Sequence, residues 1–183
     1  GTHHAFAERG EGFCLLNDMA VASDYLLHKN LVTKILVIDL DVHQGNGTAK
    51  LMENEPRVFT FSMHGKNNYP FHKEQSDLDI PLPDGISGQE YLEILEKTLP
   101  MLLETVQPNF IFYLSGVDIL STNKFGKFNI SIDECKRRDE MVLNMAYDNK
   151  IPIAIAMGGG YSPDINDILQ AHCNTFRLAA NLF

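Results

Sequence analysis

The chain has 183 residues, of which 44% are hydrophobic and 21% are charged, so a mainly disordered protein is excluded. Asp and Glu number 24 against 15 Lys and Arg, giving a net charge of −9 without any long basic run. Such a chain is not expected to bind nucleic acid directly, because phosphate contacts need clustered Lys and Arg.

No apolar run approaches the roughly 20 residues of a membrane span, so no membrane association is expected. Cys14, Cys135 and Cys173 are scattered and odd in number, which does not suit a disulfide framework. A reducing compartment is therefore expected, and we assign the protein to the cytoplasm, or to the nucleus if its source is eukaryotic.

Helical and extended segments alternate along the chain. In chain order, the predicted elements are a helix over 17–27, a strand over 34–40, a helix over 45–53, a strand over 57–63, a loop over 64–88, a helix over 89–106, a strand over 109–115, a helix over 132–149, a strand over 151–157 and a helix over 164–182. Continuous apolar runs such as 34–40 are typical of strands buried on both faces. The alternation predicts a three-layer α/β/α fold with a mainly parallel sheet.

The sequence also predicts a helix cap and an exposed basic run. Asn17 is placed to cap the first helix. The short basic run Lys136–Arg138 is interpreted as a solvated face of the helix over 132–149.

Chemically capable side chains follow the predicted strands. Asp39, Asp41 and His43 alternate at the end of the first strand, so they share one face, and Asp118 follows the third strand. Ligands bind beyond the carboxyl ends of parallel strands. Asp41, His43 and Asp118 together provide two carboxylates and one nitrogen, which is a plausible open zinc site. Taken singly, each residue also fits a capping, core or turn role, and the joint pattern favours the metal site.

Other residues suit the same chemistry. His3 and His4 are adjacent and could supply a general base and its partner, with Asp39 fixing an imidazole tautomer. The run Gly158–Tyr161 follows the last strand and fits no phosphate-loop consensus. Its glycines would allow close backbone approach, while Tyr161 points a hydroxyl at a developing oxyanion; a simple turn is the alternative.

The combination of these motifs resembles the zinc-dependent histone deacetylase family, within the arginase/deacetylase superfamily. The motifs, in order, are Gly1-Thr-His-His-Ala5, Gly12-Phe-Cys14 with Leu16-Asn-Asp18, Asp39-Leu-Asp-Val-His43, Gly116-Val-Asp118 and Gly158-Gly-Gly-Tyr161. The stretches Gln44–Gly47 and Val117–Leu120 are most similar to the class IV branch, which includes bacterial members.

The resemblance assigns roles residue by residue. It implies that Asp41, His43 and Asp118 bind a catalytic Zn²⁺, with His4 as the general base and Tyr161 stabilising the oxyanion. It also implies that Asp39 orients His3. A structural K⁺ is implied at Asp39, at the backbone carbonyls of Asp41 and His43, and at the region of Ser62 and Met63.

The resemblance further places Gly12, Phe13, Tyr69 and Gly159 along a tunnel for the acyl-lysine chain. Asn46 stands behind His4 where some members carry an aspartate, so the pKa of His4 is expected to be lower than with a carboxylate there. Gln44 replaces a histidine of other classes.

The whole chain, 1–183, is read as one deacetylase catalytic domain, and relative to the family it is expected to lack an N-terminal portion. The implied activity is removal of acetyl or other acyl groups from lysine ε-amines of proteins, so an acylated lysine peptide is the expected partner. Alternatives are an acetylpolyamine or another small acylated amine as substrate, and a non-catalytic acyl-lysine binding module. The arginase-like branch, with two metals, fits the Asp39–His43 pattern less well.

Overall fold

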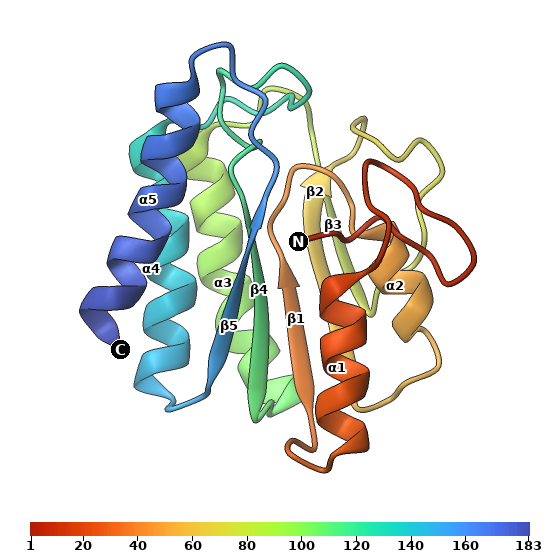
Figure 1. Ribbon diagram of the computed structural model, residues 1–183. Coiled ribbons are helices and arrows are strands. Elements are labelled where there is room, and N and C mark those ends of the chain that lie inside the picture. The colour runs from red at the N-terminus through yellow and green to blue at the C-terminus, as the bar shows by residue number, and fades with distance from the viewer.

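The computed structural model describes residues 1–183 and is built on a parallel sheet of five strands (Figure 1). The strands are β1 (Ile35–Asp39), β2 (Val58–Gly65), β3 (Leu78–Leu82), β4 (Phe110–Gly116) and β5 (Ile153–Gly158). They are ordered β3-β2-β1-β4-β5, and every neighbouring pair is parallel. The carboxyl ends of all five strands therefore meet at one edge of the sheet.

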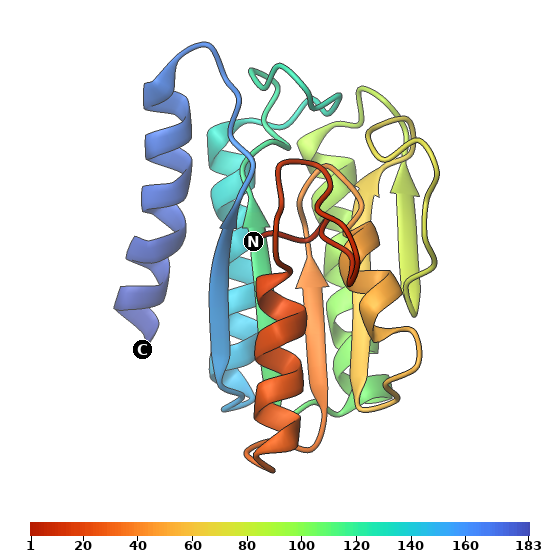
Figure 2. The same cartoon turned by 45° about the vertical axis from the view of Figure 1, so that its right-hand side comes forward.

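Helices cover both faces of the sheet, which confirms the predicted three-layer α/β/α fold. They are α1 (Asp18–His28), α2 (Asn46–Met52), α3 (Gly88–Val106), α4 (Ile132–Asp148) and α5 (Ile165–Leu182). Figures 1 and 2 show α1 and α2 on one face and α3, α4 and α5 on the other.

β1 lies at the centre of the sheet and is buried along its whole length. Leu36 and Ile38 belong to the larger core, which the sheet forms with α3 and α4. Ile35 and Val37 point the other way, into the smaller core beneath α1. Burial on both faces is the reason that this strand is a continuous apolar run rather than an alternating one.

Side-chain caps define where the main helices begin. The Asn17 side chain accepts a hydrogen bond from the backbone N–H of Ala20, which confirms the predicted cap of α1. Ser87 and Ser131 begin α3 and α4 with capping boxes, in which Glu90 and Glu134 return the hydrogen bond.

The predicted loop over 64–88 was wrong in one part, because β3 lies within it and pairs with β2 at the edge of the sheet. The segment is short and only partly buried, and it contains Pro81, which has no N–H to donate. Proline is tolerated in edge strands for this reason. A five-residue run without a strong apolar pattern gives little indication of a strand.

The interpretation of Lys136–Arg138 as a solvated face was wrong for Arg138, which is completely buried. Its guanidinium donates hydrogen bonds to the carbonyl oxygens of Leu40 and Gly116 and is paired with Asp139. A charged side chain can enter the core when its partners satisfy it there.

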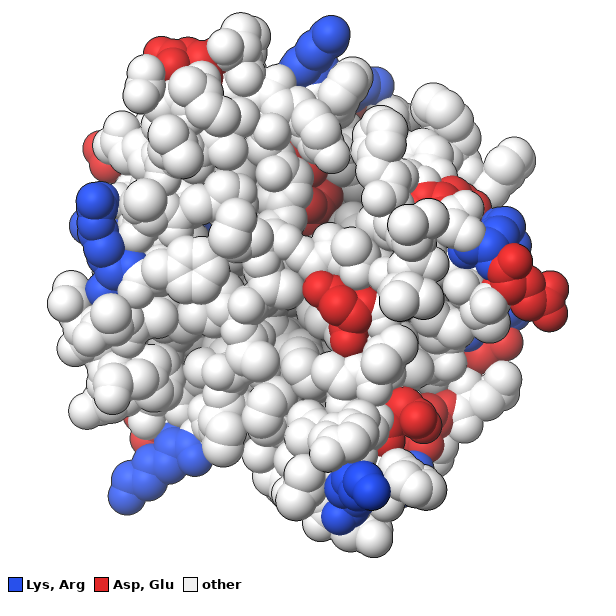
Figure 3. Space-filling model, in the orientation of Figure 1, with Lys and Arg blue, Asp and Glu red and all other residues white.

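The face of the molecule seen in Figure 3 is mostly uncharged, and Lys and Arg side chains lie near its outline.

On α1, Val21 and Tyr25 expose more than half of their surface, and they line an apolar cavity together with Phe110 and Phe112 of β4. None of the helices combines the length and hydrophobicity needed to cross a membrane.

Candidate active site

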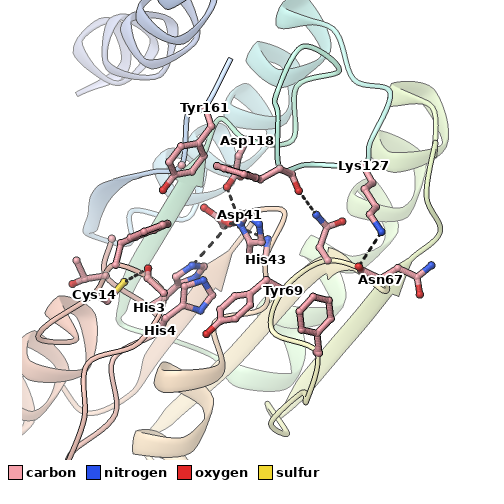
Figure 4. A pocket seen from close by; sticks show the side chains of 18 residues that line it. His3, His4, Cys14, Asp41, His43, Asn67, Tyr69, Asp118, Lys127 and Tyr161 are labelled. Carbon is pink, nitrogen blue, oxygen red and sulfur yellow. Dashed lines mark hydrogen bonds and ion pairs between the residues drawn. The ribbon is translucent and has the colours of Figure 1, made fainter. Parts of the chain in front are cut away.

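A cavity of about 670 Å³ opens at the carboxyl edge of the sheet (Figure 4). Its walls come from the N-terminal segment, from the loops after β1, β2 and β4, and from the glycine-rich segment after β5. The predicted site residues that line it are His3, His4, Gly12, Phe13, Asp41, His43, Tyr69, Asp118, Gly159 and Tyr161. Segments far apart in the sequence thus meet in one pocket.

Asp41, His43 and Asp118 converge at the floor of this pocket. The Nδ1 atom of His43 lies 3.0 Å from Asp41 Oδ1 and 3.0 Å from Asp118 Oδ2. One donor atom from each residue lies within 4.8 Å of the other two, so the three can bind a single metal ion. The three residues proposed from the sequence as metal ligands are therefore neighbours in space.

Backbone hydrogen bonds hold these ligands in place. The Val42 N–H donates to Asp118 Oδ1 at 3.0 Å, which ties the loop after β1 to the loop after β4. The His43 N–H donates to Asp41 Oδ1 at 2.9 Å, and the Gly65 N–H donates to the Val42 carbonyl at 2.8 Å. The loop after β1 is therefore anchored to both neighbouring strands.

Gly159 shows why the segment after β5 must be glycine-rich. Its φ is +59°, in the left-handed region, and a Cβ there would collide with the carboxylate of Asp118. Only glycine avoids both the strain and the collision. The chain can then pass close to Asp118 and carry Tyr161 to the pocket wall.

The electrostatics of the floor fit a divalent cation. Asp39, Asp41 and Asp118 are all buried, and their ion-pair partners are histidines rather than Lys or Arg. Burial raises the pKa of Asp41 to about 6, with the neighbouring Asp118 adding to the effect. Burial alone would lower the pKa of His43, but hydrogen bonds to Asp118 and Asp41 raise it to about 10.

The donor set itself matches zinc. Two carboxylate oxygens and one imidazole nitrogen, with the pocket open beside them, are the ligand types of a catalytic zinc site. Buried carboxylates that lack a resident lysine or arginine are stabilised when a cation joins them. The residues present therefore fit a Zn²⁺ ion.

The two tandem histidines lie beside this floor, with ring centroids 4.1 Å apart. His3 Nδ1 is 2.7 Å from Asp39 Oδ2, and His4 Nδ1 is 2.7 Å from Asn46 Oδ1. Burial, and then the neighbouring His3, lower the pKa of His4 to about 3, although the hydrogen bond that His4 Nδ1 donates to the Asn46 amide oxygen acts in the opposite direction. The imidazole of His4 is thus neutral, as a proton acceptor must be before it reacts.

Tyr161 faces the pocket beside Asp118 (Figure 4). Its backbone N–H donates to Asn123 Oδ1, and Asn123 Nδ2 donates to the Asp118 carbonyl, so Asn123 bridges the two residues. Burial raises the pKa of Tyr161, with the Asp118 charge adding to the effect, so the phenol stays protonated and can donate a hydrogen bond.

Aromatic side chains surround the mouth of the pocket. Phe13 is 91% exposed, and its ring centroid lies 6.4 Å from that of Tyr161. Tyr69 packs edge-on against His4 at 5.0 Å. Phe71 and Phe125 also line the cavity. The residues expected in the tunnel, Gly12, Phe13, Tyr69 and Gly159, all border this space.

The residues expected around K⁺ are also brought together. Asp39 and Ser62 are register partners on β1 and β2, and Met63, the next residue of β2, is buried. The Ser62 hydroxyl lies 3.0 Å from His64 Nδ1. Asp39 accepts a hydrogen bond from the Asp41 N–H at 3.2 Å in addition to its contact with His3.

Several further residues around this site were not predicted from the sequence. Glu11 contacts both Asn46 and Tyr69, Asn123 bridges Asp118 and Tyr161, and Phe71 and Phe125 border the mouth. Phe71 stands two residues after Tyr69, and this proximity could have indicated that Phe71 also lines the pocket. No spacing pattern points to Glu11 or Asn123, because Glu11 meets Asn46 and Tyr69, and Asn123 meets Tyr161, across long stretches of the sequence.

Comparison with known proteins gives a consistent result. Residues 1–176 match the family described as the histone deacetylase domain. An uncharacterized protein of Picosynechococcus sp. is 42% identical over 183 residues, which cover all of this chain and 61% of that protein. Histone deacetylase 2 of Arabidopsis thaliana is 33% identical over 164 residues, covering 88% of this chain and 42% of that protein.

Solved structures agree. The crystal structure of an HDAC homologue from Aquifex aeolicus superimposes with a TM-score of 0.84 at 28% identity, covering 98% of this chain and 50% of that one. An acetylpolyamine aminohydrolase from Burkholderia pseudomallei has the same fold, with a TM-score of 0.83 at 23% identity. The chain spans between 42% and 61% of the length of these four proteins. The family match over nearly the whole chain shows that it belongs to the histone deacetylase family.

Proposed function

We propose that this chain carries the active site of a zinc-dependent hydrolase that removes acetyl or other acyl groups from the ε-amino group of lysine in proteins. The observation that supports this function most strongly is the convergence, in one pocket, of three metal-ligating side chains, two histidines and a tyrosine. Each group required for metal-assisted amide hydrolysis is present there.

Asp41, His43 and Asp118 would hold the zinc ion at the floor of the pocket. When bound, the ion supplies Lewis-acid chemistry, polarising an acyl carbonyl and making a water molecule more acidic. The chain positions the three ligands through the backbone hydrogen bonds that join the loops after β1 and β4.

His4 serves as the general base. Its Nδ1 faces Asn46, so Nε2 is the atom left to accept a proton from the attacking water. The protonated His4 then returns this proton to the leaving lysine amine, while His3, with Nδ1 on the buried Asp39, lies alongside it with ring centroids 4.1 Å apart. Adjacent imidazoles at 4.1 Å destabilise each other's charged forms, which keeps His4 neutral before the reaction.

Tyr161 stabilises the oxyanion that develops on the acyl carbonyl. Its protonated hydroxyl lies at the wall of the same pocket, and Asn123 fixes the backbone of Tyr161 relative to Asp118. A donor held in place before the reaction stabilises developing charge without reorganising.

The aromatic mouth supports a substrate with an apolar stem. Phe13 and Tyr69 present ring surfaces around the opening, which suit the four methylene groups of a lysine side chain. We also propose a structural K⁺ next to the zinc ligands, held at Asp39, Asp41, His43, Ser62 and Met63, because Asp39 and Ser62 are register partners.

Hydrolysis of an acetyl-lysine peptide by the intact protein tests the proposal. After removal of metal with a chelator, activity should be absent, and added Zn²⁺ should restore it. An acetylated polyamine measured in parallel decides the substrate class: hydrolysis of the polyamine alone would overturn the lysine assignment. Failure of the folded, zinc-loaded protein on both substrates would overturn the hydrolase function.

A further inference from the structure

Glu11 lies at the junction of two contacts that lead into the active site. Its Oε1 atom accepts a hydrogen bond from Asn46 Nδ2 at 2.9 Å and another from the Tyr69 hydroxyl at 2.7 Å. Its second oxygen, Oε2, accepts from Arg9 Nε at 3.1 Å. Asn46 in turn contacts His4, so the connected groups are His4, Asn46, Glu11 and Tyr69.

The direction of these hydrogen bonds is set by the carboxylate. An ionised carboxylate only accepts hydrogen bonds, whereas an amide presents a donor on one side and an acceptor on the other. Glu11 therefore requires Asn46 to turn its NH₂ group outward. The Asn46 carbonyl oxygen is then left facing His4 Nδ1 at 2.7 Å.

The orientation of Asn46 determines the tautomer of His4. A carbonyl oxygen at Nδ1 requires a proton on that nitrogen, which leaves Nε2 as the unprotonated atom. With Asn46 flipped, its NH₂ group would face Nδ1 and favour the opposite tautomer, which has no lone pair on Nε2. Asn46 alone could adopt either orientation.

Tyr69 is held by the same carboxylate oxygen. Its ring packs against His4 with centroids 5.0 Å apart and an interplanar angle of 87°, and the two side chains are neighbours in Figure 4. The hydrogen bond from Tyr69 lowers the pKa of Glu11, and the bond from Asn46 adds to this effect, so Glu11 is ionised at neutral pH.

We propose that Glu11 is a positioning residue, which orients Asn46 so that His4 keeps its proton on Nδ1 and which holds Tyr69 against the His4 ring. Asn46 is neutral and contacts His4 directly. Glu11 supplies a carboxylate that acts on His4 through Asn46. The inference rests on the proposed function for its kinetic consequence, whereas the tautomer of His4 can be measured without any activity.

The first test is ¹⁵N NMR of the histidine rings in the intact, metal-free protein. In the wild type, the His4 signals should show Nδ1 protonated and Nε2 unprotonated. E11A should give a mixture of tautomers or the reverse one. E11Q keeps the size of the side chain but is no longer acceptor-only, so an intermediate result is expected. The exposed neighbour Glu8 provides the matched control E8A, which should leave the spectrum unchanged.

The second test is a double-mutant cycle with N46D. An aspartate at position 46 accepts the His4 proton directly and needs no orientation by Glu11. E11A should lower kcat by roughly 10- to 100-fold in the wild-type background, as the loss of a supporting hydrogen-bond partner commonly does. In the N46D background the same change should cost less than roughly threefold, or be favourable, because the two carboxylates repel each other.

Y69F separates the two roles of Glu11. It removes only the hydroxyl that donates to Glu11, so KM should rise while the His4 tautomer stays as in the wild type. An unchanged His4 tautomer in both E11A and E11Q would overturn the proposal, as would equal losses of kcat in the two backgrounds. A wild-type protein inactive on every substrate would instead overturn the proposed function, and the NMR result would still decide the role of Glu11.

Discussion

Two buried polar clusters meet at the carboxyl ends of β1 and β4, and they are built on opposite electrostatic plans. The pocket cluster contains Asp39, Asp41, His43 and Asp118. The arginine cluster contains Tyr113, Arg138, Asp139 and Thr175. The pocket residues lie at or just after the ends of β1 and β4, whereas the arginine cluster joins Tyr113 of β4 to α4 and α5, and both clusters are almost entirely removed from solvent.

The arginine cluster satisfies its charge from within the chain. The Arg138 guanidinium lies 2.7 Å from Asp139 Oδ1, and the same carboxylate accepts hydrogen bonds from the Tyr113 hydroxyl at 2.5 Å and from the Thr175 hydroxyl at 2.6 Å. Arg138 also donates a hydrogen bond to the carbonyl of Leu40, the residue between Asp39 and Asp41.

The pocket cluster has three carboxylates and no resident lysine or arginine among their ion-pair partners. Burial raises the pKa of Asp39 to about 7 and that of Asp41 to about 6, so ionising these two carboxyl groups is unfavourable in the folded protein. One cluster therefore pairs its carboxylate with a permanently charged guanidinium, whereas the other sets three carboxylates against histidines only and is able to bind a metal ion. The following changes test this distinction.

Arg138→Met should have the largest effect on stability. It leaves Asp139 buried without its cation, which typically costs about 3–5 kcal/mol of unfolding free energy. Denaturant unfolding followed by circular dichroism measures the loss. The double variant Arg138→Met, Asp139→Asn should recover much of it, because the amide still accepts hydrogen bonds but carries no charge. A loss below about 1 kcal/mol would show that the cluster is not a structural support.

Asp118→Asn should disable the pocket cluster as a cation site. Removing one of three ligands should lower the zinc content, measured by mass spectrometry of the metal, and reduce hydrolysis on the order of 10³-fold, since the metal contributes several kcal/mol. Added Zn²⁺ should raise the melting temperature of the wild type and not that of the variant. The exposed Asp24→Asn is the control. Full zinc content in Asp118→Asn would contradict the ligand assignment.

Tyr161→Phe should lower kcat by about 10²–10³-fold, the effect of losing one oxyanion donor. The zinc content should stay unchanged, which separates this role from that of the ligands. Tyr147→Phe, at an exposed position on α4, should leave kcat as in the wild type. Unaltered kcat in Tyr161→Phe would remove the tyrosine from the mechanism.

The pH dependence of the unfolding free energy should also distinguish the two clusters, with the smallest effect of these predictions. In the metal-free protein, the raised pKa of His43 means that the folded state binds more protons than the unfolded state from about pH 6.5 to about 10. Unfolding free energy should therefore fall as the pH rises from 7 to 10, by at most about 1.4 kcal/mol per pH unit. His43→Asn should flatten this slope, and Arg138→Met should not. Stability that rises over this range would contradict the ion pairs assigned to His43.

Particular residues show how far sequence patterns reach. The run 34–40 and its three counterparts predict strands, and in β1, β2 and β4 burial on both faces is the reason for the continuous apolar residues. β3 and β5 are both edge strands and only partly buried, but β5 keeps a continuous apolar run, whereas β3 is interrupted by Asp79 and Pro81 and gives no such pattern. The sequence predicts an exposed Arg138, because the carbonyl groups of Leu40 and Gly116 that bind its guanidinium lie 98 and 22 residues away.

By itself, the sequence determined the parallel α/β fold and the residues capable of metal and proton chemistry at the strand ends, because local periodicity and strand polarity act over short distances. Only the tertiary structure decided which of these side chains converge, how Asn123 bridges Asp118 to Tyr161, and that Glu11 meets Asn46 and Tyr69. Such contacts depend on how loops from separate strands pack against one another. No local pattern encodes that packing, since most of these contacts join residues that are distant along the chain.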